Sequence, residues 1–336
     1  MYLHDALVPG AIGPEWLAGI TVPVCLLACW LTAAAVIGWC GKRLDRTGSY
    51  RAVVRAERAA AWARLGATGV FVLGVLGLGW LGAVRELVGD RIVLDEMVAF
   101  APLVGVFALT WWSLYPIERR LREAALLREL DEGVPVAAIV PRRAYVANAV
   151  RHQMLIVLVP LLMVMTWAEV VDRLATVGPG WAQRFLGTPA GYGVATIAGV
   201  TGLFVLSPAV LRWIWRTTPL GEGPILDRIR SMCVRHRVRV QRILVWWTHG
   251  TLTNAAVMGI WGRIRYVLLS DALLDHLEAD QVEAVAAHEV AHVRRRHIPW
   301  LAATILSMIT VASVPMGWLV EVTLGVEAAN GWAGAT

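Results

Sequence analysis

The sequence predicts an α-helical multi-pass membrane protein that carries a small α+β subdomain in the aqueous phase. Hydrophobic residues make up 57% of the 336 residues and charged residues only 17%, whereas a soluble domain is about one quarter charged. The mean hydropathy is +0.59. Apolar stretches of about 20 residues, the length of a membrane-spanning helix, recur along the chain. One long basic segment near the C-terminal end interrupts this pattern.

Six apolar stretches are long enough to cross a bilayer, and they divide the chain into three parts. Residues 1–216 are expected to form a membrane domain of five helices, and residues 217–299 a catalytic subdomain. Residues 300–336 would hold the sixth helix and an extracytoplasmic tail. The predicted spans are 17–39, 65–84, 97–115, 154–171, 191–215 and 298–322.

The charges of the linkers predict the orientation of the chain. The first, third and fifth linkers are rich in arginine, and the second and fourth are mixed or nearly uncharged. The positive-inside rule then puts the odd-numbered linkers in the cytoplasm and the N-terminus outside. Residues 1–16 lack the positive region of a signal peptide, so the first stretch should remain as a span. We expect an integral protein of a bacterial inner membrane.

The net charge of +6 does not indicate a nucleic-acid-binding protein. The basic residues lie between apolar stretches, where they orient a membrane protein, so the bilayer is the partner that they predict. In the third linker, residues 117–130 have the pattern of a basic amphipathic helix. We expect it to lie on the anionic inner leaflet, with a partner-binding helix as the alternative.

The fifth linker predicts the subdomain. A helix should begin at Pro224 and strands should follow, from Val238 to Trp247, over 255–260 and over 264–269. A short helix over 273–277 should precede a longer one, capped by Asp280 with Glu283 three residues on. A small sheet before a capped helix is a plausible scaffold for a site.

The longer helix contains the run His288-Glu289-Val290-Ala291-His292. Residues four apart share one face of a helix, so both imidazoles can bind one Zn²⁺ ion per chain. Glu289 lies beside the first ligand, where its carboxylate can accept a proton from a water that zinc activates. The four cysteines form no Cys-x-x-Cys pair, so they predict neither a disulfide framework nor a cysteine zinc site.

His297, Glu321 and Glu327 are the other candidates near this motif. If the helix continues through Arg296, His297 lies about 140° from the ligand face, which favours an interfacial or polar role. Glu321 and Glu327 would follow the sixth span and so lie across the membrane from the histidines, about 30 Å away. Neither glutamate is assigned.

The segment 221–297 resembles the HtpX/CAAX-prenyl-protease family of membrane zinc metallopeptidases. The resemblance implies that His288 and His292 bind zinc and that Glu289 is the general base. It also implies a third ligand, a glutamate on a later helix, which we expect beyond Thr336 in a longer reading frame. The resemblance rests on Leu273-Leu274-Asp275-x-Leu277, Glu283-Ala284-Val285, Ala287-His288-Glu289-x-x-His292-Val293 with His297, and, upstream, Thr253-Asn254-Ala255, Gly259 and Arg265-Tyr266-Val267-Leu268-Leu269.

Together these features predict a membrane-embedded zinc endopeptidase that hydrolyses membrane-associated proteins or peptides on the cytoplasmic side. Two alternatives stay open. One is a sensor peptidase of the antirepressor type, in which an aspartate commonly occupies the position of His297 and fewer spans precede the motif. The other is a catalytically inactive membrane scaffold.

Overall fold

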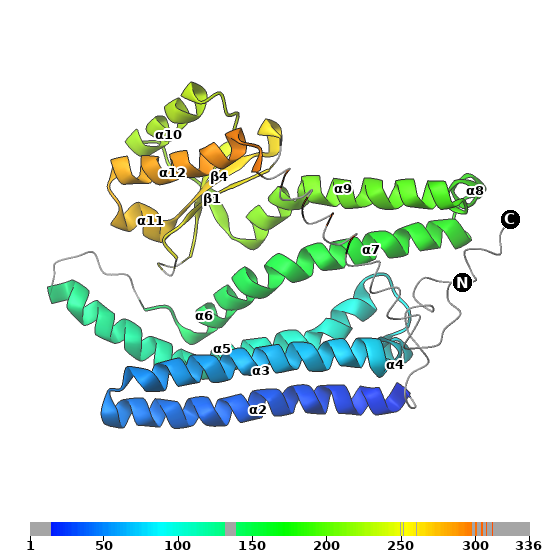
Figure 1. The fold of residues 1–336 in the computed structure, drawn as a ribbon, viewed down its shortest axis with the longest axis horizontal. Helices are drawn as coiled ribbons and strands as arrows, with labels where there is room; N and C mark the ends of the chain where they lie inside the picture. The colour runs from blue at the N-terminus through cyan, green and yellow to red at the C-terminus, as the bar shows by residue number, and fades with distance from the viewer. Residues whose placement is uncertain are drawn as a thin grey trace.

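The structure, a computed structural model, combines a bundle of long helices with a small sheet subdomain packed at one end (Figure 1). It describes residues 15–131, 139–248, 250, 252–259 and 261–297, with positions 300, 304, 307 and 311. Most of the sixth predicted span, and both Glu321 and Glu327, lie outside these residues.

Four described helices are long and apolar enough to cross a membrane, and a fifth span results if the bent helix over residues 189–214 is counted as one. They correspond to the first five predicted spans, and the predicted count of six stays untested. The helices of this part are α2 (Glu15–Thr47), α3 (Tyr50–Gly77), α4 (Trp80–Val88), α5 (Leu94–Asp131), α6 (Arg142–Ala149), the π-helical turn η1 (Val150–Leu155), α7 (Ile156–Val177), α8 (Gly180–Leu186) and α9 (Pro189–Ile214).

Two predicted elements in the helical bundle differ from the structure. The second span does not run to residue 84, because α3 ends at Gly77 and α4 begins after Gly79. Gly79 has a φ of 73°, a left-handed conformation that interrupts a helix and that glycine adopts readily. Residues 117–130 are helical as predicted, but they are the second half of α5, so the expected separate surface helix is wrong.

The connections alternate between the two ends of the bundle (Figure 1). The α2–α3 turn, the end of α5, the start of α6 and the sheet subdomain lie at one end, and α4 and α8 lie at the other. The arginine-rich linkers therefore share one end of the bundle, as the charge pattern predicts. Which end faces the cytoplasm remains a prediction.

The subdomain is a four-stranded sheet with the order β1-β2-β4-β3. Strands β2 and β4 are parallel, and the other two pairs are antiparallel. Only 242–246 of the run predicted from Val238 to Trp247 is a strand, and the short β1 was not predicted. The elements are β1 (Thr217–Pro219), α10 (Pro224–Arg235), β2 (Arg242–Trp246), β3 (Ala255–Met258), the 3₁₀ turn η2 (Gly262–Ile264), β4 (Tyr266–Ser270), α11 (Asp271–His276) and α12 (Ala279–Arg294).

The cap of α12 also differs from the prediction. Glu278, and not Asp280, is the N-cap residue, and it forms a reciprocal capping box with Gln281. The backbone N–H of Glu278 donates to the Gln281 side chain at 3.1 Å. A glutamate can therefore replace the usual short cap residue here, because glutamine at the third position completes the box.

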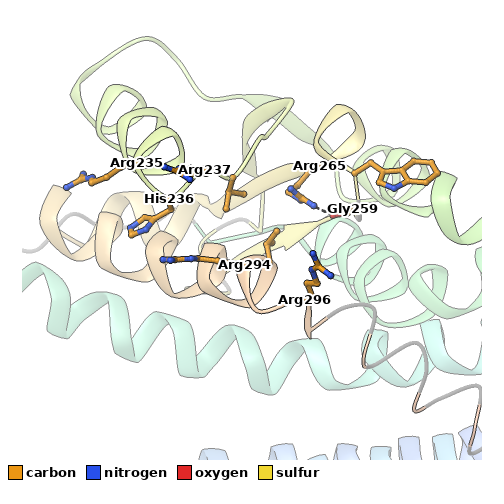
Figure 2. A pocket seen from close by; sticks show the side chains of 10 residues that line it. Arg235, His236, Arg237, Gly259, Arg265, Arg294 and Arg296 are labelled. Carbon is orange, nitrogen blue, oxygen red and sulfur yellow. Dashed lines mark hydrogen bonds between the residues drawn. The ribbon is translucent and has the colours of Figure 1, made fainter.

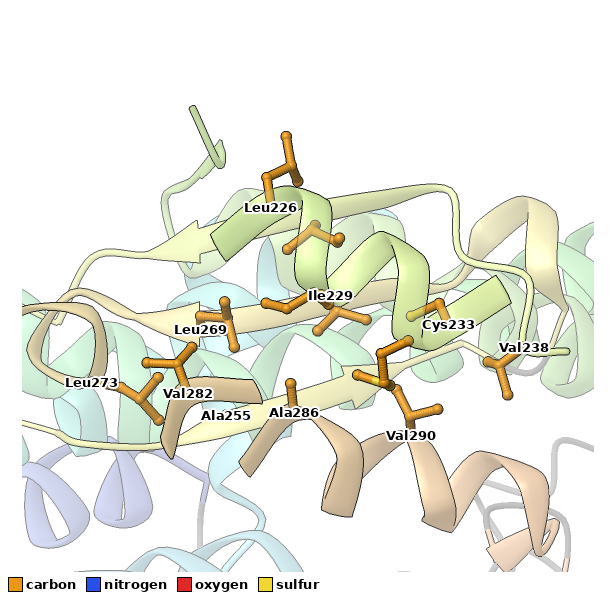
Figure 3. Close-up of a cluster of buried hydrophobic side chains, with 13 residues drawn as sticks. Leu226, Ile229, Cys233, Val238, Ala255, Leu269, Leu273, Val282, Ala286 and Val290 are labelled. Carbon is orange, nitrogen blue, oxygen red and sulfur yellow. The ribbon is translucent and has the colours of Figure 1, made fainter. Parts of the chain in front are cut away.

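The two faces of the sheet pack against different layers. Alternate strand residues point to opposite faces, so Val267 and Leu269 of β4 join a core with α10 and α12, shown in Figure 3. Tyr266 and Leu268 of the same strand pack on the other face, against the end of α9 and the start of α7. The sheet is thus the layer that connects α12 to the membrane helices.

The core under α12 yields a stability prediction. Ile229 of α10 is fully buried, and Val234 on the same helix is 77% exposed. Ile229→Ala should lower the free energy of unfolding by about 2–5 kcal/mol, because it leaves a cavity between α10 and α12. Val234→Ala, the matched control, should change it by about 0.5 kcal/mol or less. Thermal unfolding of the detergent-purified variants measures both, and equal shifts would contradict the packing described here.

Candidate metal centre

His288, Glu289 and His292 meet on one face of α12. The His288 Nε2 and His292 Nε2 atoms lie 3.2 Å apart, and one possible ligand atom from each of the three residues lies within 4.8 Å of the others. Glu289 and His292 are half-buried and His288 is exposed. Among the described residues, this is the group of three that could hold a metal ion.

The spacing of the two imidazoles fits zinc. Two nitrogens at the usual Zn–N distance and the tetrahedral angle lie about 3.3 Å apart, and the observed Nε2–Nε2 distance is 3.2 Å. The two rings are nearly perpendicular, at 83°, with centroids 4.9 Å apart. The donor set of two imidazoles and a neighbouring carboxylate is also the one that zinc prefers. These residues therefore fit the predicted ion.

Helix α12 is held by the face opposite the metal face. Val282, Ala286 and Val290 are buried in the core under the sheet. His292 is rotated about 200° from Val290, so packing one face turns the imidazoles away from the core. At the surface, the guanidinium groups of Arg228 and Arg235 on α10 pair with Asp280 and Glu283 of α12.

His297 lies against His292, although the sequence predicted a continuing helix that would carry it away. That expectation is wrong, because α12 ends at Arg294 and Arg296 adopts a φ of 56°. The chain turns back, and the Nδ1 atoms of His297 and His292 come within 2.6 Å. This contact uses the ring nitrogen of His292 that faces away from His288, so His297 is not part of the ligand group.

Asp271, at the start of α11, orders the loop that follows β2. Its carboxylate accepts hydrogen bonds from the backbone N–H groups of Thr248, Gly250 and Ala272. Burial raises the pKa of the Asp271 carboxyl, but the hydrogen bonds from Thr248, Ala272 and Gly250 outweigh it and hold that pKa below its usual value. The ionised carboxylate thus fixes the junction of β4 and α11, the segment that leads into α12.

His152 joins the sheet to the membrane helices, a role that no sequence pattern indicates. The Trp246 Nε1–H of β2 donates to His152 Nε2 at 2.8 Å, and the two rings stack. The other ring nitrogen lies 2.9 Å from the Asn148 carbonyl oxygen. In this arrangement Nε2 accepts and Nδ1 donates, so both ring nitrogens of His152 have a partner. A contact across 94 positions of the chain has no local pattern that could reveal it.

The cavity in Figure 2, of about 970 Å³, lies behind the end of α12 and is strongly basic. Its α12 residues, Val293 and Arg294, are rotated about 100° and 200° from His292, so the cavity and the imidazole pair occupy different faces. Burial lowers the pKa of Arg265, whose guanidinium donates to the carbonyl oxygens of Gly259 and Arg239. The other basic lining residues are Arg235, His236, Arg237 and Arg296.

The subdomain matches a known peptidase family. Residues 234–332 match the family model described as "Peptidase family M48". The chain is 29% identical over 145 residues to a "Protease HtpX homolog" of Aeropyrum pernix, covering 41% of this chain and 44% of that protein. It is 27% identical over 115 residues to "Protease HtpX homolog 1" of Sulfolobus acidocaldarius, covering 31% and 37%. The chain thus spans less than half the length of these two curated relatives.

Among solved structures, the crystal structure of S. mikatae Ste24p is similar over 90% of this chain and 72% of that one, with 14% identity and a TM-score of 0.32. That similarity is too distant to support an argument. The family match covers the segment with His288, Glu289 and His292. Over residues 234–332 the chain is therefore similar to peptidase family M48, and the curated relatives that it matches are HtpX protease homologues.

Proposed function

We propose that this chain is a membrane-embedded zinc endopeptidase that hydrolyses peptide bonds of proteins or peptides at the membrane surface. The observation that carries the proposal is the pair of imidazole Nε2 atoms, 3.2 Å apart on one face of α12 with Glu289 beside them. The catalytic unit is the subdomain of residues 217–299, and the preceding helices are its membrane anchor.

In this proposal each of the three residues has one role. His288 and His292 hold the ion through their Nε2 atoms. When bound, zinc lowers the pKa of a water molecule and polarises the scissile carbonyl. The Glu289 carboxylate accepts the proton from that water as oxygen attacks the carbonyl carbon. It then delivers the proton to the leaving amine, so one water is consumed for each peptide bond broken.

A catalytic zinc site uses three protein ligands and keeps its fourth position for water. Since Glu289 acts as the base, the described residues supply two ligands. The third is proposed to be a glutamate on a later helix, as the resemblance to the HtpX/CAAX-prenyl-protease family implies.

His297 is proposed to position His292. Metal-bound histidines usually donate their second ring N–H to a partner, which fixes the tautomer and the ring orientation. Here the His292 Nδ1–H can donate to the His297 Nδ1, 2.6 Å away, and this leaves the His292 Nε2 for zinc. The turn at Arg296 brings His297 into this place.

The position of the subdomain supports the proposal that the substrate is bound at the membrane surface. One face of the sheet packs directly on the ends of α9 and η1, so α12 is held close to the bundle. We propose that this end is cytoplasmic, because the three arginine-rich linkers share it.

The first prediction from this proposal tests Glu289 as the base. Glu289→Ala should lower peptidase activity by about 10²-fold or more while zinc remains bound, because the residue moves protons and is not a ligand. His288→Ala should lose zinc as well. Casein hydrolysis and the zinc content of the purified protein measure the two effects. Glu283→Ala, on the same helix, is the control and should keep both. Normal hydrolysis by folded Glu289→Ala protein would rule out the assignment.

A second prediction separates positioning from ligation at His297. His297→Ala should weaken zinc binding by about 10–100-fold, because the orientation of His292 is lost. His236→Ala, a histidine outside the site, should leave the affinity unchanged. Titration against a chelating dye gives the affinities. Unchanged zinc affinity in His297→Ala would contradict the positioning role, and complete zinc loss would make His297 a ligand.

The third prediction concerns orientation. In a cysteine-free background and intact cells, a membrane-impermeant thiol reagent should label Gly180→Cys and not Asp275→Cys. Both positions are exposed, and a side chain at Gly180 meets no neighbour within 4 Å. The arginine-rich end should face the cytoplasm, where the reagent does not reach. The opposite labelling pattern would invert the proposed topology.

A further inference from the structure

A second basic cavity, of about 600 Å³, lies where the sheet subdomain meets the membrane helices. Its basic residues come from separate parts of the chain: Arg151 from η1, Arg212 from the last turn of α9, Arg216 from the corner that follows, and Arg242 from β2. This cavity is distinct from the one behind α12, because the two share no lining residue.

The charges in this cavity have no acidic partner among the described residues. Within the part of the chain that the structure describes, the guanidinium groups of Arg151, Arg216 and Arg242 make no hydrogen bond or ion pair. That of Arg212 lies over the Tyr266 ring, 5.2 Å from its centroid. Arg151 and Arg216 are close enough to repel each other electrostatically. An anion between the arginines would offset that repulsion.

The backbone also holds one of these arginines in an unusual conformation. Arg216 has a φ of 48°, which is uncommon for a residue with a side chain. Its backbone N–H donates to the Trp213 carbonyl oxygen, which closes the end of α9. The turn directs the chain from α9 into β1, and it brings Arg216 into the lining of the cavity.

The cavity lies at the level of the membrane surface. Arg151 lies shortly before the predicted span 154–171, and Arg216 immediately follows the span 191–215. The two helices that carry these spans, α7 and α9, contact each other, and α9 also contacts η1. Trp213, another lining residue, is 80% exposed, as expected for a tryptophan at a lipid–water interface.

The rest of the lining is apolar. Leu155, Ile214 and Leu244 contribute to the wall, so the cavity has a basic part and a hydrocarbon part. A free phosphate ion would use only the arginines. A phospholipid would use both, with its headgroup phosphate among the guanidinium groups and its acyl chains along the lipid-facing surface of the spans.

We propose that this cavity binds the headgroup phosphate of one anionic phospholipid and that Arg151, Arg216 and Arg242 are its ligands. Arginine suits the role because its planar fork makes bidentate hydrogen bonds to phosphate oxygens. The site differs from a diffuse attraction between basic linkers and an anionic leaflet, because it predicts one bound lipid and particular residues. A lipid held here would also bridge the membrane helices and the sheet.

The test compares two double variants of the full chain, purified in detergent and titrated with phosphatidylglycerol under native mass spectrometry. Arg151→Gln/Arg216→Gln should bind the first lipid about tenfold more weakly or worse, because two charge-assisted contacts are lost. Arg51→Gln/Arg58→Gln is the control. It removes the same charge from exposed positions of α3 and should bind like the unaltered chain.

Further arms of the experiment identify the ligand. Phosphatidylcholine should bind more weakly than phosphatidylglycerol, and inorganic phosphate should not compete at concentrations that match the lipid. Equal loss in both double variants, equal binding of the zwitterionic lipid, or full competition by phosphate would each overturn the proposal. If the Arg151/Arg216 variant does not fold, Arg242→Gln at an exposed strand position should still weaken binding, and an unchanged affinity would refute the site.

Discussion

The structure depends on the two-sided burial of one strand. All five residues of β4 are buried, and they alternate between the core under α12 and the layer formed by α9 and η1. Because successive residues of a strand point to opposite faces, β4 fixes the helix with the histidines and the membrane helices at the same time. A shift of one residue in its pairing would exchange the two layers.

This arrangement explains how one exposed and one half-buried histidine can be preorganised at the protein surface. The core side of α12 is packed by Val282, Ala286 and Val290, which fixes the rotation of the helix about its axis. The opposite face then presents His288 and His292 with their Nε2 atoms at the separation that one zinc ion requires. The packing of the core face of α12 thus sets the positions of the two imidazoles on the opposite face.

The arginine residues gather at one end of the molecule, and their roles depend on the acceptors available there. The basic linkers share one end of the bundle, and two basic cavities form at or near the subdomain. In the cavity behind α12, Arg235 pairs with Glu283, and Arg265 donates to backbone carbonyl groups. At the junction with α9, the described part of the chain supplies no such acceptors for Arg151, Arg216 and Arg242. The same residue type therefore fills structural roles in one place and remains available to a ligand in the other.

The sequence by itself determined the features that local periodicity controls. Hydropathy located five helices of the bundle, though not the break at Gly79, because continuous hydropathy does not register one left-handed residue. The spacing of His288 and His292 placed both imidazoles on one helix face, since four residues make about one turn. Only the tertiary structure decided the rest: the turn at Arg296 that returns His297 to His292, the three-residue strand β1, and the contact of His152 with Trp246. These features depend on single backbone conformations or on contacts between residues far apart in the chain. A local sequence pattern predicts neither.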